Sequence, residues 1–76
     1  MIWCIEDDAS IRDIEMYALN SAGFETKGFE EGLSFWDELK REKPELIILD
    51  VMLPGMDGVE ILKKLRDSME YKGIPV

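Results

Sequence analysis

The chain has 76 residues, which is enough for one small domain. It carries 17 acidic and 9 basic residues, and this net charge of −8 argues against a surface that contacts nucleic acid or an anionic membrane. The absence of histidine excludes a histidine-based catalytic triad and the common zinc sites. The single cysteine, Cys4, excludes an internal disulfide and is predicted to be a small buried side chain because it lies in an apolar run.

The amino-terminal segment gives no sign of export. It lacks basic residues and meets acidic ones directly after the apolar run 1–5, unlike a secretory signal peptide. No apolar run approaches the roughly 20 residues that cross a bilayer. We therefore expect a cytoplasmic protein that does not enter the membrane.

Apolar periodicity divides the chain into strands and helices in alternating order. The expected strands are 1–5, 24–29 (at an edge), 46–49 (covered on both faces) and the beginning of a fourth at 73–76. The expected helices are 9–22, capped by Asp8 or Ser10 and ended by Gly23, then 31–41 and 57–69. Strands separated by helices of about a dozen residues form parallel crossovers, so the chain is predicted to have a layered α/β fold.

Each expected helix carries apolar residues on one side. These sides are Ile11, Ile14, Ala18 and Ala22 in the first helix, Leu33, Trp36 and Leu39 in the second, and Val59, Leu62, Leu65 and Met69 in the third.

Acidic residues follow the first and third expected strands. Glu6, Asp7 and Asp8 come after residues 1–5, and Asp50 comes after 46–49. Parallel strands place their carboxyl ends at one edge of a sheet, so these side chains share a pocket if the two strands are neighbours, about 4.8 Å apart. Clustered carboxylates repel one another or bind a cation, and Mg²⁺ suits one or two carboxylates plus phosphate oxygens. Glu6, Asp7 and Asp50 are candidate ligands, whereas Asp8 is better explained as a helix cap.

The stretch after Asp50, VMLPGMDG at 51–58, is restricted in conformation. Pro54 disfavours helical geometry at the residue before it, and Pro54-Gly55 indicates a turn. The main-chain carbonyls after Asp50 should therefore point in fixed directions, and one of them could be a metal ligand. Asp57 is expected to cap the third helix.

Three segments resemble the receiver domain of two-component response regulators: IEDD (5–8), IILD (47–50) and LDVMLPGMDG (49–58). The resemblance spans the whole chain. It implies a flavodoxin-like, CheY-like α/β fold with a parallel sheet of order 2-1-3(-4-5) and flanking helices. Over residues 1–76 it implies a partial receiver domain, with three strand–helix units and the start of a fourth strand.

The resemblance also implies a role for each site residue. Asp50 would be the phosphoacceptor, taking a phosphoryl group from a histidine kinase or a phosphotransfer protein. Mg²⁺ would be bound by Asp7, Asp50 and the Met52 main-chain carbonyl, with Glu6 acting mostly through water. The module would accept phosphoryl groups without being a turnover enzyme, and many such receivers belong to transcription regulators.

The family pattern includes two further residues, a Ser or Thr after a fourth strand and a Lys after a fifth. Neither position lies within these 76 residues. We therefore expect about the first three-fifths of a receiver domain, with impaired phosphorylation when taken alone. The apolar sides of the first and third helices and one edge of the 46–49 strand would lack cover, so the chain is expected either to fold poorly or to self-associate.

Other functions fit the residues less well. A haloacid-dehalogenase-type phosphotransferase requires a second aspartate two residues after the nucleophile, where this chain has Met52. Dinucleotide-binding and P-loop modules need a glycine-rich turn after the first strand, where this chain has EDDAS. A pseudo-receiver, which is a protein-interaction module of the same fold without phosphorylation, is the remaining alternative, and Glu6, Asp7 and Asp50 weigh against it.

Overall fold

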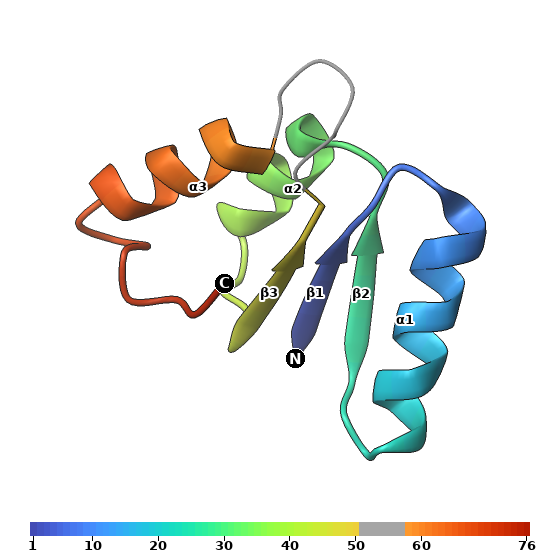
Figure 1. Cartoon of the computed structure of the whole chain (residues 1–76). Coiled ribbons are helices and arrows are strands. Elements are labelled where there is room, and N and C mark those ends of the chain that lie inside the picture. The colour runs from blue at the N-terminus through green and yellow to red at the C-terminus, as the bar shows by residue number, and fades with distance from the viewer. Residues whose placement is uncertain (51–57) are drawn as a thin grey trace.

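The computed structural model describes residues 1–50 and 58–76, which form a parallel sheet flanked by helices (Figure 1). Strands and helices alternate along the chain, as the periodicity predicts. Their bounds are β1 Ile2–Ile5, α1 Ala9–Ser21, β2 Thr26–Phe29, α2 Gly32–Leu39, β3 Leu46–Leu49 and α3 Gly58–Asp67.

The sheet has the order β2-β1-β3, with both strand pairs parallel. This order agrees with the one that the resemblance implies, and β2 occupies an edge as predicted. In register, Cys4 of β1 lies between Gly28 of β2 and Ile48 of β3. All the strands therefore direct their carboxyl ends toward the same edge of the sheet (Figure 1).

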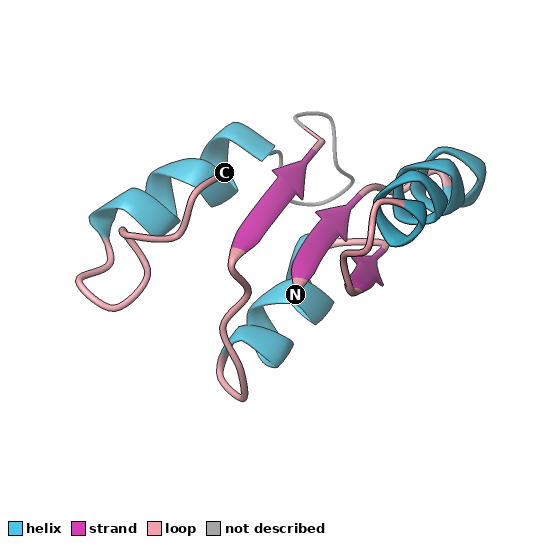
Figure 2. Cartoon of the chain, turned by 90° about the horizontal axis from the view of Figure 1, so that it is seen from below, coloured by secondary structure: helices cyan, strands magenta, loops and turns pink. Residues whose placement is uncertain are grey.

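The helices cover the two faces of the sheet unequally. Helix α1 lies on one face, and α2 and α3 lie on the other, where the core is (Figure 2). The Trp3 ring lies at the centre of this core, with ring-centroid distances of 4.8 Å to Phe29 and 5.8 Å to Phe35. The buried core residues are Trp3, Ile5, Phe29, Phe35, Leu39, Ile47, Ile61, Leu65 and Ile74.

Local signals in the sequence set both ends of α1. The Asp8 side chain accepts hydrogen bonds from Ser10 N at 2.9 Å and from Ile11 N at 3.1 Å, which makes it the N-cap. Gly23 has a φ of 97°, a conformation that a residue with a Cβ rarely adopts. Both assignments confirm the sequence prediction.

The buried sides of α2 and α3 agree with the prediction at Leu39 and Leu65 and differ from it at other positions. Leu33 is 69% exposed and Met69 is 83% exposed, while Phe35 and Ile61 are fully buried. Each helix begins with a buried glycine, Gly32 in α2 and Gly58 in α3. A helix turns by about 100° per residue, so the residue directly after each glycine points away from the sheet. The buried sides instead consist of Gly32, Phe35 and Leu39 in α2 and of Gly58, Ile61 and Leu65 in α3.

The predicted apolar side of α1 is largely uncovered. No residue of this helix is buried, and Ile11 and Ile14 are 46% and 68% exposed. Strand β3 is likewise less covered than expected, because only Ile47 of its four residues is buried. The cause is that α1 packs on β1 and β2, which leaves the same face of β3 partly open. Self-association through these surfaces stays a prediction.

Residues 73–76 form no strand, contrary to the expectation. One main-chain bond, from Ile47 N to Pro75 O at 2.9 Å, places this segment beside β3. Pro75 has no N–H with which to donate a ladder bond in return, so a regular strand pairing does not develop there. Arg66 fixes the segment by donating to Ile74 O at 3.0 Å.

Cys4 lies on the central strand and is completely buried, as predicted. Burial raises the pKa of its thiol above the ordinary value, and the nearby negative charge of Glu15 raises it further. The thiol is therefore protonated at neutral pH.

A charged cluster joins β2 to α2. Lys27 Nζ binds the Glu38 carboxylate and lies 3.2 Å from Glu42 Oε1, while Arg41 Nη1 lies 3.2 Å from Glu38 Oε1. The hydrogen bond from Lys27, followed by that from Arg41, lowers the pKa of Glu38. In return, the hydrogen bond to Glu38 raises the pKa of Lys27.

Replacing Phe35 with alanine should destabilise the chain by about 3–5 kcal/mol, because it removes a buried ring from the aromatic core. Urea unfolding followed by far-ultraviolet circular dichroism measures this change in the free energy of unfolding. Phe24→Ala is the matched control, since Phe24 is 53% exposed and should matter much less. Equal effects of the two substitutions would contradict the core described above.

The Lys27–Glu38 pair should make stability depend on acid pH. Because the pKa of Glu38 is lowered on folding, its contribution is complete above the ordinary value of 4.5 and is lost as the pH falls through the lowered one. Lys27→Met should therefore flatten the decline of the urea midpoint below pH 4.5. Lys40→Met, at a lysine 3.8 Å from Asp37, should leave that decline unchanged.

Candidate metal centre at the carboxyl ends of β1 and β3

Main-chain hydrogen bonds continue one residue beyond the strands and fix the positions of two acidic residues. Glu6 N donates to Phe29 O of β2 at 3.0 Å, and Asp50 N donates to Ile5 O of β1 at 3.0 Å. Glu6 and Asp50 are therefore held at neighbouring strand ends by the same ladder that builds the sheet.

Three carboxylates meet at this edge. One carboxylate oxygen from each of Glu6, Asp7 and Asp50 lies within 4.8 Å of the others. Glu6 and Asp50 are partly buried, and Asp7 is exposed. The juxtaposition expected from the sequence is thus present. Asp8 lies outside this group, because its side chain caps α1.

Electrostatics disfavours three charges in this arrangement. Partial burial raises the pKa of Glu6, and the neighbouring carboxylates of Asp7 and Asp50 raise it further, against the opposing effect of a hydrogen bond from Asp8 N at 3.3 Å. A bound cation would relieve this repulsion. Converging carboxylate oxygens with one exposed member are a donor set that fits Mg²⁺, which keeps part of its water shell.

Several sequence predictions fall outside the described residues. These are the Met52 carbonyl as a metal ligand, the turn at Pro54-Gly55 and the helix cap at Asp57. They stay predictions.

Arg12 is a residue near the cluster that the sequence analysis missed. It lies on α1, and its Nη1 donates to the main-chain oxygen of Glu6 at 2.6 Å. The only signal in the sequence is its position one helical turn after the capping residue Asp8, which directs it toward the end of β1.

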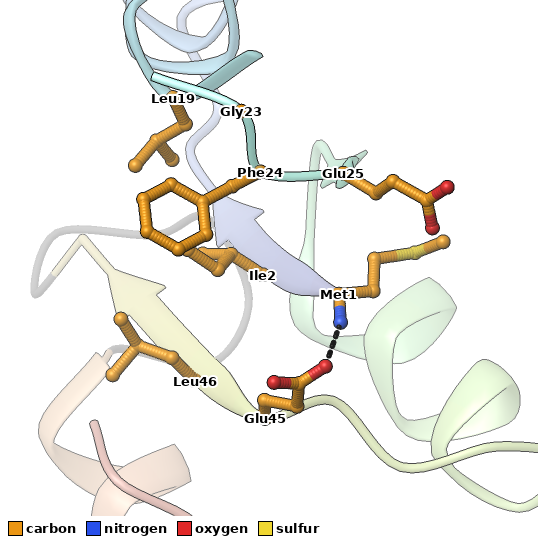
Figure 3. A pocket seen from close by; sticks show the side chains of 8 residues that line it. All are labelled: Met1, Ile2, Leu19, Gly23, Phe24, Glu25, Glu45 and Leu46. Atoms are coloured by element: carbon orange, nitrogen blue, oxygen red, sulfur yellow. Dashed lines mark hydrogen bonds and ion pairs between the residues drawn. The ribbon is translucent and has the colours of Figure 1, made fainter.

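A cavity of about 600 Å³ lies at the opposite ends of the strands. The side chains of Ile2, Leu19, Phe24 and Leu46 line it, and the amino group of Met1 binds Glu45 beside it at 2.7 Å (Figure 3). Because Ile2 and Leu46 begin the strands that the carboxylates follow, this cavity is separate from the candidate metal centre.

Comparison with known proteins identifies the family. The family model named response regulator receiver domain matches residues 2–76 of the sequence. The chain therefore belongs to this family. Among curated relatives, the transcriptional regulatory protein CseB of Streptomyces coelicolor is 40% identical over 64 residues. These residues cover 84% of this chain and 27% of the relative, so the chain corresponds to about a quarter of that regulator.

Solved structures give the same classification. The chemotaxis response regulator CheY4 of Vibrio cholerae superposes with a TM-score of 0.90 at 30% identity, covering 97% of this chain and 62% of that one. The response regulator TrrA of Thermotoga maritima was solved in complex with Mg²⁺-BeF. It superposes with a TM-score of 0.84 at 26% identity, covering 91% of this chain and 60% of that one. The fold is therefore that of a CheY-like receiver domain, of which this chain spans about three-fifths. None of the helices in residues 1–50 and 58–76 is long and apolar enough to span a membrane.

Proposed function

We propose that this chain is the phosphoacceptor part of a receiver domain, in which Asp50 takes a phosphoryl group with the help of Mg²⁺. Asp7, Asp50 and the Met52 carbonyl bind the ion directly in this proposal, and Glu6 binds it through water. The donor is a histidine kinase or a phosphotransfer protein. The activity is acceptance of a phosphoryl group, without turnover of a substrate by the chain itself.

The observation that carries this proposal is the convergence of Glu6, Asp7 and Asp50 within 4.8 Å at the ends of two neighbouring parallel strands. Hydrogen bonding of Asp50 N to Ile5 O supports a role for Asp50 as a rigidly held nucleophile. The Mg²⁺-BeF complex of the Thermotoga relative supports the choice of metal.

The chemistry assigned to Asp50 is attack on phosphorus. A carboxylate oxygen forms a new O–P bond while the P–N bond of the donor phosphohistidine breaks. The electron pair of that bond stays on the imidazole nitrogen, which takes up a proton from solvent. Bound Mg²⁺ supplies neutralisation of the charge on the phosphoryl oxygens.

The remaining residues prepare the acceptor for this step. Partial burial of Glu6 and Asp50 limits the water around the reacting carboxylate, while exposure of Asp7 leaves the edge open to a donor protein. The product would be an aspartyl phosphate, which adds roughly two negative charges at the end of β3. Such a charge change can bias the surface that partner proteins contact.

A pseudo-receiver that binds proteins without phosphorylation is the alternative. Such a module has no need for three carboxylates in one cluster, since their mutual repulsion opposes folding. The cluster therefore favours the phosphoacceptor.

Replacing Asp50 with asparagine should abolish phosphorylation, because an amide oxygen is a poor nucleophile. The measurement is phosphoryl incorporation by intact-mass spectrometry after incubation with acetyl phosphate and Mg²⁺. Asp67→Asn, at an exposed position of α3, should incorporate as much as the unchanged chain. Undiminished incorporation by Asp50→Asn would refute the assignment.

Replacing Asp7 with asparagine should weaken Mg²⁺ binding by about tenfold or more, because it removes one charged ligand. Asp8→Asn is the matched control one residue away. It should leave affinity nearly unchanged, because asparagine also caps helices well. Isothermal titration calorimetry with MgCl₂ measures the dissociation constant of Mg²⁺ for each variant. A larger loss for Asp8→Asn than for Asp7→Asn would show that the acidic residues are assigned in the wrong order.

A further inference from the structure

Arg12 connects α1 to the acidic end of β1. Its Nη1 donates to the main-chain oxygen of Glu6 at 2.6 Å, and this contact is partly buried. Glu6 O lies just beyond the end of β1, which stops at Ile5. Because the guanidinium binds this oxygen, it immobilises the peptide group that links Glu6 to Asp7.

Gly28 provides the space through which the Arg12 side chain reaches that oxygen. A Cβ built on Gly28 would lie 2.9 Å from Arg12 Cδ and 2.7 Å from Met16 Sδ, both closer than ordinary contact. The side chains of Arg12 and Met16 thus cross β2 directly over the glycine. Any larger residue at position 28 would displace the stem that carries the guanidinium.

The other contacts of the acidic segment leave one part of it without a fixed partner. Glu6 N is bound to Phe29 O, and Asp8 is fixed as the cap of α1. Between them lies the Glu6–Asp7 peptide, whose orientation determines where the exposed Asp7 carboxylate points. Among the described residues, Arg12 holds the oxygen of that peptide through its hydrogen bond.

We propose that Arg12, seated over Gly28, is a positioning residue that holds the Glu6–Asp7 peptide so that the carboxylates of Asp7, Glu6 and Asp50 converge on a cation. The proposal rests on the metal site proposed above and adds a residue that does not itself bind the metal. Outer contacts of this kind typically change metal affinity by about 10–100-fold.

Charge and position have opposite effects here, which makes the proposal testable. The guanidinium is a cation near a cation site, so its charge alone opposes Mg²⁺ binding. Arg12→Met should tighten binding if charge is all that matters, and should weaken it by about tenfold if positioning matters. Gly28→Ala leaves every charge in place and should also weaken binding, even though alanine suits a strand better than glycine.

The first measurement needs no metal. Backbone ¹⁵N relaxation of the Mg²⁺-free chain should show lower order parameters at Asp7 in Arg12→Met and in Gly28→Ala than in the unchanged chain. Arg41→Met, which removes an exposed arginine bound only to Glu38 among the described contacts, should leave them unchanged. Unchanged order at Asp7 in both test variants would overturn the proposal.

The second measurement is a Mg²⁺ titration of the same four proteins by calorimetry, at a temperature where circular dichroism shows all of them folded. Weaker binding by Arg12→Met and Gly28→Ala, with Arg41→Met unchanged, supports the positioning role. Equal or tighter binding by Arg12→Met overturns it. If the unchanged chain binds no Mg²⁺ but Asp7 still loses order in the two variants, the proposed metal function fails while the positioning of Asp7 by Arg12 stands.

Discussion

The central position of β1 determines where the acidic side chains lie. Its main-chain groups pair with β2 on one side and with β3 on the other, and each ladder continues one residue past the strand, through Glu6 N and Asp50 N. A slip of one residue in either pairing would turn the alternating side chains to the opposite face. A slip between β1 and β3 would also separate Glu6 from Asp50. The register of three short strands therefore sets the geometry of the whole cluster.

The aromatic core secures that register against the repulsion within the cluster. Trp3 lies two residues before Ile5 and packs against Phe29 and Phe35, so the strand that carries Glu6 is fixed by contacts on its buried face. Carboxylates that repel one another oppose folding, and a small domain has limited stability to offset this. Placing the acids at the ends of the best-packed strand confines the unfavourable charges to one edge. Stability and function are thus divided between the middle and the end of the same strand.

The sequence predicts the fold and the main part of the site because both depend on strand ends. Alternating apolar runs indicate the order of elements, and acids that follow parallel strands must share an edge, which accounts for Glu6, Asp7 and Asp50. The sequence does not predict which sides of α2 and α3 face the sheet. Leu33 and Phe35 are equally apolar in the sequence, yet α2 buries Gly32 and Phe35 and leaves Leu33 exposed. Arg12 escapes prediction for a similar reason, since its contact with Glu6 requires the absence of a side chain on β2.

Burial of Cys4 gives the molecule a built-in reporter. The thiol is protonated and buried on the face of β1 that α1 covers, opposite Trp3 and Ile5, so a thiol reagent can modify it only when the packing of α1 on the sheet opens. The rate of modification therefore measures how often this packing opens, at a position two residues before Glu6. A cation bound between the ends of β1 and β3, as proposed above, would stabilise the closed form and slow this reaction. Protection of this sole cysteine from the reagent would then report occupancy of the proposed cation site.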